Sequence, residues 1–522
     1  MTSNTSLILP NQALSPQVPW KYLNRLLWLP DDARSMGIHI MAGKGSGKSR
    51  LMGRTISWLD FIRGVPQVIF DPHGPTIDNF LDKFLRLPPE TQTSLRPRLQ
   101  YIDMSGQSGY VYPFPLYYRN GTESLYEISQ RFLDVVRKID PYLQTASVEG
   151  WNALWRTGTY TGMILAALGY QISEAEEMLR DPLRWENQFE TAIEHFPELI
   201  PAVLYMRELE NSKDNIRNRR TESFFNKIAL FSLDPAMKAM FASSQAGLDW
   251  NEVIGRHKTI LLDFRHEHDL ERRRFKMVWA FNYFLDFIKQ RGAGRHRPIG
   301  LVIDELTSLF SIQALGSDLF GSELDELINV IARNYSVWLT IAHQELFQVT
   351  ERILKSLMTM GTQIMGVTTD PEGARYLAQL YFQYKPYLVK KYEAVYGSSM
   401  GSSVILDYRS VEFTTEEQLT LQSYRFIRQG RFRFLVRPAV MEGDLTGRLR
   451  AISIENFDRN IYPDDKVLSI FRQRSMEKNG LSVEDALNGI SRRLLTSTEV
   501  KALAVNKRST KPAVKEKIPF WG

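Results

Sequence analysis

A glycine-rich loop near the N-terminus has the residue types and spacing of a phosphate-binding site. Residues 42–49 read AGKGSGKS, which fits the P-loop pattern G-x-x-x-x-G-K-[ST] with Ala42 in its first position. Glycines let successive backbone N–H groups turn inward around a phosphate chain, which side chains would obstruct. We therefore predict a nucleotide site in which Lys48 reaches the β- and γ-phosphates and Ser49 holds Mg²⁺. The residues expected to line the nucleotide are Gly43, Lys44, Gly45, Ser46, Gly47, Lys48, Ser49 and Arg50.

The residues around this loop supply the context that such a site needs. Apolar residues from Ile38 to Met41 predict a buried strand before it, and residues 51–62 predict a helix after it. The N-terminus of that helix would face the bound anion. A glycine turn that fits the pattern by chance is the alternative, but the flanking strand and helix favour nucleotide binding.

Adjacent carboxylates end a second apolar run, IGLVIDE at 299–305. Opposite a phosphate-binding loop, Asp304 would hold the Mg²⁺ shell together with Ser49, and Glu305 would polarise the attacking water. Taken alone, the pattern also fits a strand that runs into an acidic helix cap. Its pairing with the loop favours the catalytic interpretation.

A polar pair, His343-Gln344, follows the apolar run 337–342. A side chain at that position can contact both the γ-phosphate and the attacking water, so Gln344 is a candidate sensor. Arg333 precedes the run on a predicted helix and would face away from its own site. We predict that it serves a neighbouring subunit as an arginine finger; a surface salt bridge is the alternative.

Three other groups allow two interpretations each. Asp71, at the end of the run 68–70, could orient Mg²⁺ or water, or could cap the helix that starts near Thr76. The aromatic stretch 110–118 could stack bases, but its two prolines favour a rigid packed connector. The arginines of 216–220 could meet phosphates, although a solvated helix face is favoured.

The stretch 424–438, YRFIRQGRFRFLVRP, reads as a hairpin that turns at Gln429-Gly430. Its alternation separates arginines from phenylalanines. The basic face could line a DNA channel, whereas an edge strand protected by charge is the favoured alternative.

The candidate site residues need buried strands to position them, and the sequence contains apolar runs that predict such strands. Strands are predicted at 68–70, 99–103, 258–264, 299–305, 337–342 and 360–368, with helices over 274–289 and 370–379. From Glu123 to about Leu248 the apolar spacing is helical. We therefore predict an α/β fold with a mainly parallel central sheet and an inserted all-α domain.

A chain of 522 residues is too long for one core. We predict four parts: a lead-in at 1–36, a nucleotide-binding domain at 37–122 and 249–440, the helical insertion at 123–248, and a C-terminal extension at 441–522 with a mobile basic tail.

Composition narrows the classes of site. There is no cysteine, which excludes disulfides and cysteine-ligated metal centres. Eight basic and two acidic residues lie between Ser491 and Gly522, so this tail accounts for the whole net charge of +6. Such a tail is most often a solvated arm and otherwise a contact for nucleic acid or an acidic partner.

No window of 18 uncharged apolar residues and no cationic-then-apolar leader is present. We therefore expect a soluble cytoplasmic protein that reaches an inner membrane only through partners.

Four motifs, in order, carry a family resemblance. AGKGSGKS, FDPHG, LVIDE and ARNYSVWLTIAHQ, with a helical insertion between the second and third, resemble the HerA/FtsK superfamily of P-loop ATPases, above all the TraG/TraD-like coupling proteins of conjugation and type IV secretion. The likeness covers Leu29 to Pro438 and implies a RecA-like fold and a hexameric motor that moves DNA with ATP and Mg²⁺. By that likeness Lys48 and Ser49 take the Walker A roles, Asp304 and Glu305 the Walker B roles, Gln344 the sensor role and Arg333 the finger role.

The resemblance also implies partners. These are DNA, further copies of the chain, and a relaxase or a secretion-channel component. Membrane-bound coupling proteins begin with transmembrane helices, whereas the 41 residues before this loop hold no spanning segment. The alternative within the class is therefore a soluble HerA-like translocase that works with a nuclease. An alternative of another class is an ATP-gated ring scaffold that does not translocate DNA. Glu305 argues against it, because a scaffold needs no carboxylate to activate water.

Overall fold

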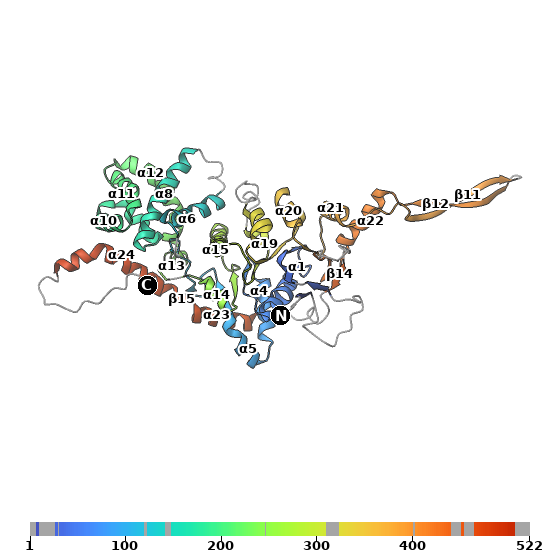
Figure 1. The fold of residues 1–522 in the computed structure, drawn as a ribbon, viewed down its shortest axis with the longest axis horizontal. Coiled ribbons are helices and arrows are strands. Elements are labelled where there is room, and N and C mark those ends of the chain that lie inside the picture. The colour runs from blue at the N-terminus through green and yellow to red at the C-terminus, as the bar shows by residue number, and fades with distance from the viewer. Residues whose placement is uncertain are drawn as a thin grey trace. The chain divides into compact units, whose positions relative to one another are not determined.

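The computed structural model describes residues 7–9, 27–29, 31–119, 123–140, 148–245, 247–309, 323–399, 402–439, 450–453 and 464–506 (Figure 1). The chain forms two compact units. The first comprises Met1–Ser105 and Asp249–Ser475, and the second comprises Gly106–Leu248 and Met476–Gly522. The residues after Asn506 in the expected basic tail lie outside the described part.

A nine-stranded sheet forms the centre of the first unit, in the order β14-β13-β10-β3-β9-β8-β4-β7-β5. The seven strands from β10 to β5 are parallel. They are β3 (Ile38–Met41), β4 (Gln67–Asp71), β5 (Leu99–Asp103), β7 (Thr259–Asp263), β8 (Ile299–Ile303), β9 (Val337–His343) and β10 (Thr362–Met365). Every residue in them is buried, as expected for continuous apolar runs in a parallel sheet. The predicted α/β class with a mainly parallel sheet is confirmed.

Two antiparallel strands extend the sheet beyond β10. β13 (Arg433–Arg437) pairs with β10, and β14 (Arg450–Ser453) pairs with β13. The predicted hairpin at Gln429-Gly430 is wrong, because the residues before this turn belong to helix α22 (Thr415–Ile427). A capping box between Thr414 and Glu417 starts that helix.

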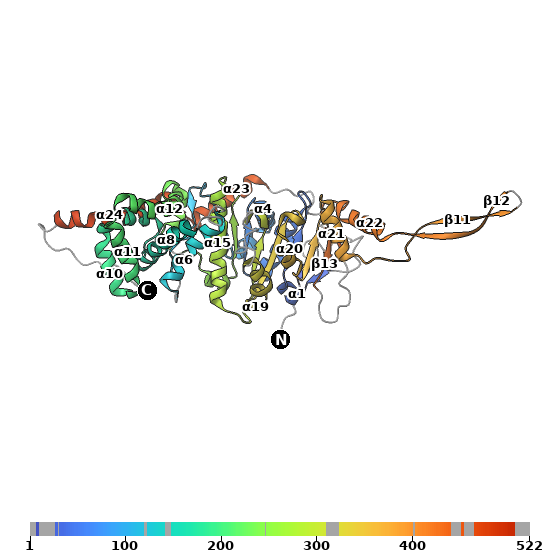
Figure 2. The same cartoon turned by 90° about the horizontal axis from the view of Figure 1, so that it is seen from above.

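Helices connect the strands of the first unit. They are α1 (Asp31–Ser35), α2 (Lys48–Leu51), η1 (Met52–Ile56), α3 (Ser57–Arg63), α4 (Pro75–Leu85), α5 (Pro89–Leu95), η2 (Arg96–Arg98), α14 (Trp250–Gly255), α15 (Leu270–Arg291), α16 (Leu306–Leu309), η5 (Leu327–Ile331), α19 (Ala332–Asn334), η6 (Leu346–Gln348), α20 (Glu351–Met358), α21 (Pro371–Tyr381) and α22. In Figure 2, α15 and α20 run alongside the strands. Phe70 of β4 packs edge-on against Phe281 of α15, with ring centroids 6.3 Å apart.

The helix after the glycine-rich loop is continuous from Lys48 to Arg63, but its middle turn, η1, is a π-helix. It begins three residues before the predicted start at Leu51. Gly53 lies in this π-helical turn against α4, where an added Cβ would come 2.3 Å from the carbonyl oxygen of Thr76. The absence of a side chain at Gly53 therefore sets how closely these two helices approach.

Two short or separate strand pairs complete the first unit. β1 (Leu7–Leu9) pairs with β2 (Leu27–Leu29), and β11 (Val389–Ser399) pairs with β12 (Ser402–Glu412), both antiparallel. The long β11–β12 hairpin was not predicted. Tyr392, Tyr396 and Tyr408 on it are 66%, 64% and 61% exposed, so it has no core of its own among the described residues.

Among its described residues, the second unit is helical apart from one pair of two-residue strands, β6 (Tyr110–Val111) and β15 (Leu481–Ser482). Its helices are α6 (Leu125–Ile139), α8 (Val148–Leu168), α9 (Ile172–Arg180), η3 (Pro182–Trp185), α10 (Glu186–His195), η4 (Pro197–Leu199), α11 (Ile200–Glu210), α12 (Asp214–Leu233), α13 (Pro235–Phe241) and α24 (Val483–Asn506). Helix α23 (Asp465–Asn479) runs from one unit into the other.

The division differs from the predicted domains, which made 441–522 a separate extension. The β6–β15 pairing and the hydrogen bonds from Arg493 to Glu174 Oε1 (2.9 Å) and to the carbonyl oxygen of Ala242 (2.6 Å) join the C-terminal helix to the helical unit instead. Within the described ranges, none of the helices combines the length and the apolar character that crossing a membrane requires.

Candidate functional site

Three neighbouring parallel strands end at one edge of the sheet and carry the predicted site residues. The glycine-rich loop follows β3, Gln344 follows β9, and the pair Asp304-Glu305 follows β8. β9 pairs with both β3 and β8, so the three strand ends lie side by side. This edge is where open parallel sheets bind ligands.

Lys48 lies between the two carboxylates. Its Nζ is 3.1 Å from Oε2 of Glu305 and 3.3 Å from Oδ1 of Asp304, and all three side chains are nearly buried. Burial acts to lower the pKa of Lys48, but the charges and hydrogen bonds of Asp304 and Glu305 together raise it above its ordinary value. The lysine is therefore held as a cation at the edge of the loop.

Asp304 is anchored by two hydroxyl groups. Oδ2 accepts hydrogen bonds from Oγ of Ser49 (3.0 Å) and from Oγ1 of Thr76 (2.5 Å). The other oxygen, Oδ1, is buried and faces Nζ of Lys48 at 3.3 Å. A carboxylate whose oxygen bonds a serine hydroxyl offers the oxygen ligands that Mg²⁺ prefers. Sequence reasoning missed Thr76, since a threonine early in a helix carries no signal for a contact with Asp304.

Glu305 is held from two sides. Oε2 accepts a hydrogen bond from Nε2 of Gln344 (2.7 Å), and Oε1 accepts one from Oγ1 of Thr307 (2.7 Å). Its backbone has φ 63°, a left-handed conformation that residues other than glycine seldom adopt. The predicted sensor Gln344 thus touches the predicted water-polarising carboxylate directly.

The glycine-rich loop has the backbone that its sequence predicts. Gly45 and Gly47 have φ of 78° and 102°, in the left-handed region. A Cβ added at Gly45 would meet no atom within 4 Å, whereas one at Gly47 would come 2.3 Å from Cδ1 of Phe432. The loop is therefore open at Gly45 and covered at Gly47, and it leads directly into helix α2, as a phosphate site requires.

Asp71 caps a helix, one of its two predicted roles. Its carboxylate accepts hydrogen bonds from the backbone N–H groups of Gly74 (2.7 Å) and Ile77 (2.9 Å). Burial, and after it the charges of Asp304 and Asp263, raise the pKa of Asp71 to about 7. With both of its oxygens occupied by loop and helix N–H groups, Asp71 supports the turn after β4.

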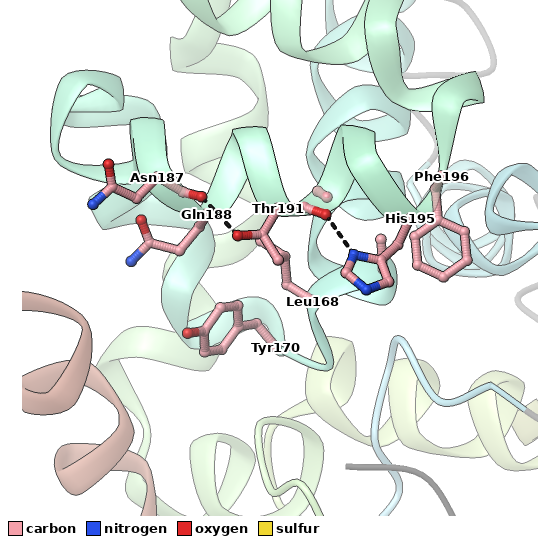
Figure 3. Close-up of a pocket in the computed structure, with 9 residues that line it drawn as sticks. Leu168, Tyr170, Asn187, Gln188, Thr191, His195 and Phe196 are labelled. Atoms are coloured by element: carbon pink, nitrogen blue, oxygen red, sulfur yellow. Dashed lines mark hydrogen bonds between the residues drawn. The ribbon is translucent and has the colours of Figure 1, made fainter.

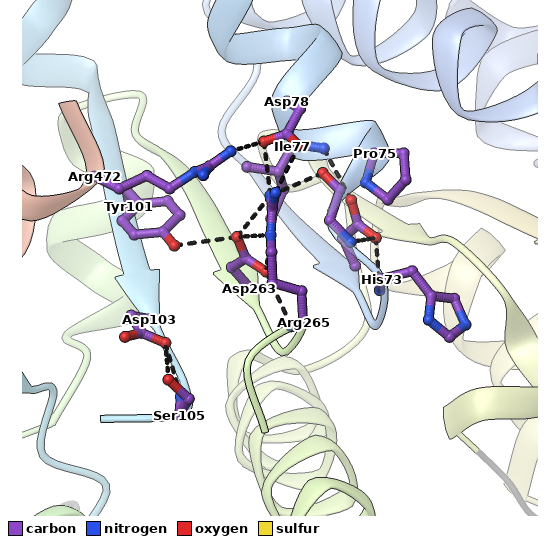
Figure 4. A network of polar contacts seen from close by, with 12 residues as sticks. His73, Pro75, Ile77, Asp78, Tyr101, Asp103, Ser105, Asp263, Arg265 and Arg472 are labelled. Atoms are coloured by element: carbon purple, nitrogen blue, oxygen red, sulfur yellow. Dashed lines mark hydrogen bonds and ion pairs between the residues drawn. The ribbon is translucent and has the colours of Figure 1, made fainter. Parts of the chain in front are cut away.

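Arg265 joins neighbouring elements beside that turn (Figure 4). It donates to Asp263 at the end of β7 (2.8 Å) and to both oxygens of Asp78 on α4 (2.6 and 2.7 Å). Arg472 of α23 also donates to Asp78, and the hydroxyl of Tyr101 on β5 donates to Asp263 at 3.1 Å. Every positive charge in this network faces a carboxylate, so we assign it a structural role.

A buried histidine pair lies beneath the site. The rings of His39 on β3 and His343 on β9 stack with centroids 4.9 Å apart, and their Nε2 atoms are 2.7 Å apart. Nδ1 of His343 lies 2.9 Å from the carbonyl oxygen of Glu345, next to Gln344. Nδ1 of His39 lies 2.5 Å from Oε1 of Gln363. The pair therefore links the strand before the loop to the turn that carries Gln344.

Burial lowers the pKa of both histidines. That of His39 falls to about 4 although its hydrogen bond with Gln363 opposes the change. That of His343 falls well below its ordinary value, through burial and then through the charge of His39. Both rings are therefore neutral at physiological pH.

The described chain does not bring Arg333 into this site. It is exposed on α19 and makes no hydrogen bond or ion pair with any described residue, so the surface salt bridge weighed as the alternative is not formed among them. The arginines of 216–220 instead include Arg217, which pairs with Asp214 (2.8 Å), and Arg220, which pairs with Glu208 (2.7 Å), as a solvated helix face would.

A groove of about 500 Å³ lies in the helical unit (Figure 3). Two of its polar side chains bond to their own helix: His195 Nδ1 lies 2.8 Å from the carbonyl oxygen of Thr191, and the Thr191 hydroxyl donates to the carbonyl of Asn187 at 2.9 Å. No ion pair converges on this groove within the described chain, so the strand-end site of the first unit is the better candidate for chemistry.

Comparison with known proteins gives structural likeness only. No protein-family model and no curated protein matches the sequence. The chain is similar to the unbound bacterial conjugative coupling protein TrwBdeltaN70 (15% identity, 82% of this chain and 86% of that chain, TM-score 0.48) and to the plasmid coupling protein TrwB in complex with ADP and Mg²⁺ (15%, 82% and 87%, 0.47). It is also similar to VirB4 of Thermoanaerobacter pseudethanolicus (12%, 80% and 89%, 0.45). At these identities and TM-scores the function has to be read from the site itself.

Proposed function

We propose that this chain is an ATPase that couples ATP hydrolysis to the movement of DNA and acts as a homo-hexameric ring. One observation carries the ATPase assignment. The loop lysine, the two carboxylates and a glutamine come from three neighbouring strand ends and contact one another within 3.3 Å. This is the set of groups that phosphoryl transfer to water needs.

Each residue of the site has a role in ATP hydrolysis that follows from its position. Backbone N–H groups of the loop and the Lys48 cation bind the phosphate chain. Ser49 and Asp304 would hold Mg²⁺, which supplies charge neutralisation when bound. Glu305 accepts the proton of the attacking water, and Gln344 fixes the orientation of that carboxylate and of the water.

The same contacts favour hydrolysis over an ATP-gated scaffold. A binding-only switch needs the loop and the metal ligands but no second carboxylate. Glu305 is held by Gln344 and Thr307 in a left-handed backbone conformation, and such strain is typical of functional positions.

The DNA and ring parts of the proposal are supported by the order of the four sequence motifs, which resembles that of coupling proteins and related translocases. Arg333 would act in trans in such a ring, with DNA and either a relaxase, a secretion-channel component or a nuclease as partners. Its exposure leaves it accessible to a neighbouring copy.

Steady-state ATPase assays with and without DNA test the proposal. We expect Mg²⁺-dependent hydrolysis that DNA stimulates, and we expect Glu305→Gln to slow hydrolysis by roughly 10²- to 10⁴-fold while ATP binding, measured by calorimetry, is retained. Hydrolysis at the same rate with and without DNA would remove the motor assignment and leave an ATPase. Full hydrolysis by the Glu305→Gln variant would remove the catalytic assignment.

A further inference from the structure

A short segment more than 380 residues downstream covers the outside of the glycine-rich loop. The N–H group of Phe432 donates to the carbonyl oxygen of Ser46 at 2.8 Å. Nε of Arg431 donates to the carbonyl oxygen of Gly45 at 2.9 Å. Both bonds use carbonyl oxygens, so neither occupies an N–H group of the loop.

Two guanidinium groups lie close to the ring of Phe432. Arg50 lies over it with 5.2 Å between its Cζ and the ring centroid, and the corresponding distance for Arg431 is 5.1 Å. The ring also occupies the space above Gly47, where a side chain would collide with it. Phe432 has φ 63°, a left-handed backbone conformation that the two loop contacts hold in place.

The sheet order places this segment opposite the catalytic groups. Asp304 and Glu305 follow β8, which lies on one side of β3, beyond β9. Phe432 leads into β13, which lies on the other side of β3, beyond β10. A nucleotide whose γ-phosphate meets Lys48, with the attacking water between it and Glu305, would therefore extend its other end toward Phe432.

We propose that Phe432, together with Arg50 and Arg431, forms the base-binding side of the nucleotide site. This inference rests on the proposed ATPase function and adds the recognition of the base. An aromatic face and guanidinium planes are surfaces on which a purine stacks. Stacking depends on a π-face, which every base has, so the site recognises the presence of a base more than its identity. The ligand class is accordingly a nucleoside triphosphate, with ATP and GTP both accepted.

Calorimetric binding of ATP, GTP and inorganic tripolyphosphate, each with Mg²⁺, tests the proposal on the full chain. The wild type is expected to bind ATP and GTP within a few-fold of each other and tripolyphosphate more weakly. Phe432→Ala should weaken ATP and GTP binding by roughly 5- to 100-fold and leave tripolyphosphate binding unchanged. Phe432→Tyr should bind like the wild type, because it keeps the aromatic face.

Tripolyphosphate also reports on the loop itself, since it needs the phosphate site and no base contact. A Phe432→Ala variant that loses ATP and tripolyphosphate equally would show that Phe432 only supports the loop and would overturn the proposal. Unchanged ATP binding would also overturn it. The matched control is Arg433→Ala, an exposed neighbour on β13, which should leave all three affinities unchanged. A wild type that binds tripolyphosphate as tightly as ATP would overturn the base site alone, and one that binds neither would overturn the ATPase proposal with it.

Discussion

Thr76 supports Asp304, the carboxylate proposed to bind Mg²⁺. Its hydroxyl donates to Oδ2 of Asp304 at 2.5 Å, on the same oxygen that Ser49 contacts. Residues that hold a metal ligand in place orient it, and their loss lowers the affinity for the metal. Thr76→Val keeps the shape of the side chain but removes the donor. We expect it to weaken Mg²⁺ binding by roughly 10- to 100-fold, measured as the Mg²⁺ dependence of ATP binding.

The matched control is Thr93→Val on α5, whose hydroxyl bonds only to the carbonyl oxygen of Pro89 among the described residues. It should leave the Mg²⁺ dependence unchanged. An unaltered Mg²⁺ dependence in the Thr76→Val variant would show that Ser49 alone is sufficient to hold Asp304.

His39 makes stability depend on pH. Its pKa in the folded protein is about 4, against an ordinary value of 6.5. Below about pH 6.5 His39 is protonated in the unfolded chain but not in the folded chain. The contribution of His39 to the free energy of unfolding is therefore complete above about pH 6.5 and falls by about 1.4 kcal/mol per pH unit toward pH 4. We expect His39→Gln to remove this slope from the free energy of unfolding, measured by urea denaturation from about pH 4.5 to 7.

Asp71 has the opposite effect: its pKa is raised to about 7, so its contribution to stability falls as pH rises from about 4 to 7. Both the wild type and the His39→Gln variant contain Asp71, so the difference between their slopes reports on His39. His268→Gln, at an exposed position of the first unit, is the control and should keep the wild-type slope. An equal slope in the His39→Gln variant would show that His39 is not neutral in the folded protein.

At the scale of the element, the π-helical turn η1 depends on Gly53. A Cβ there would lie 2.3 Å from the carbonyl oxygen of Thr76 and 3.1 Å from the backbone nitrogen of Phe80, so the helix would have to move away from α4. We expect Gly53→Ala to lower the free energy of unfolding by about 1–3 kcal/mol, measured in urea. Gly255→Ala, whose added Cβ would meet nothing within 4 Å at the end of α14, should be neutral or slightly stabilising. Equal stabilities of the two variants would contradict the close approach.

The parallel strands could be predicted because each is a short continuous apolar run that ends in a charged or small residue. Helix α22 was missed because the apolar residues near its end also alternate as in a strand. In so short a run the helical period and the strand period cannot be told apart. The capping box Thr414–Glu417 and the later Gly430 were the available signals for that helix. The β11–β12 hairpin is exposed on both faces, so its sequence lacks the alternation of apolar and polar residues that predicts a half-buried strand.

The core of the candidate site could be predicted from motifs, since parallel strands bring their ends together. The contacts around it could not, because they join residues that no local pattern connects. Thr76 and Asp304 are 228 residues apart, and Arg431 and Gly45 are 386 apart. Only the packed sheet, with β13 added beyond β10, places these pairs in contact.

At the scale of the whole molecule, the role proposed for Arg333 concerns a neighbouring copy of the chain in the proposed ring. If it completes the site of the next subunit, Arg333→Ala should bind ATP normally but lose turnover by roughly 10³-fold or more. Lys48→Ala should fail to bind and hydrolyse ATP but still carry an intact arginine. Mixing the two inactive variants should therefore restore ATPase activity, since a Lys48→Ala subunit donates its arginine to an Arg333→Ala site.

The control is each variant mixed with itself, which should stay inactive. A mixture of both variants that exchanges subunits and yet remains inactive would remove the finger assignment and leave the ATPase site intact.

The left-handed backbone at Glu305 bears on how this protein responds to selection. A side chain held there costs about 1–3 kcal/mol of folding stability, a cost that the proposed role of Glu305 in hydrolysis would account for. In a library selected for heat resistance alone, glycine and asparagine should therefore accumulate at residue 305. The most thermostable descendants would then be those that had lost the ability to hydrolyse ATP.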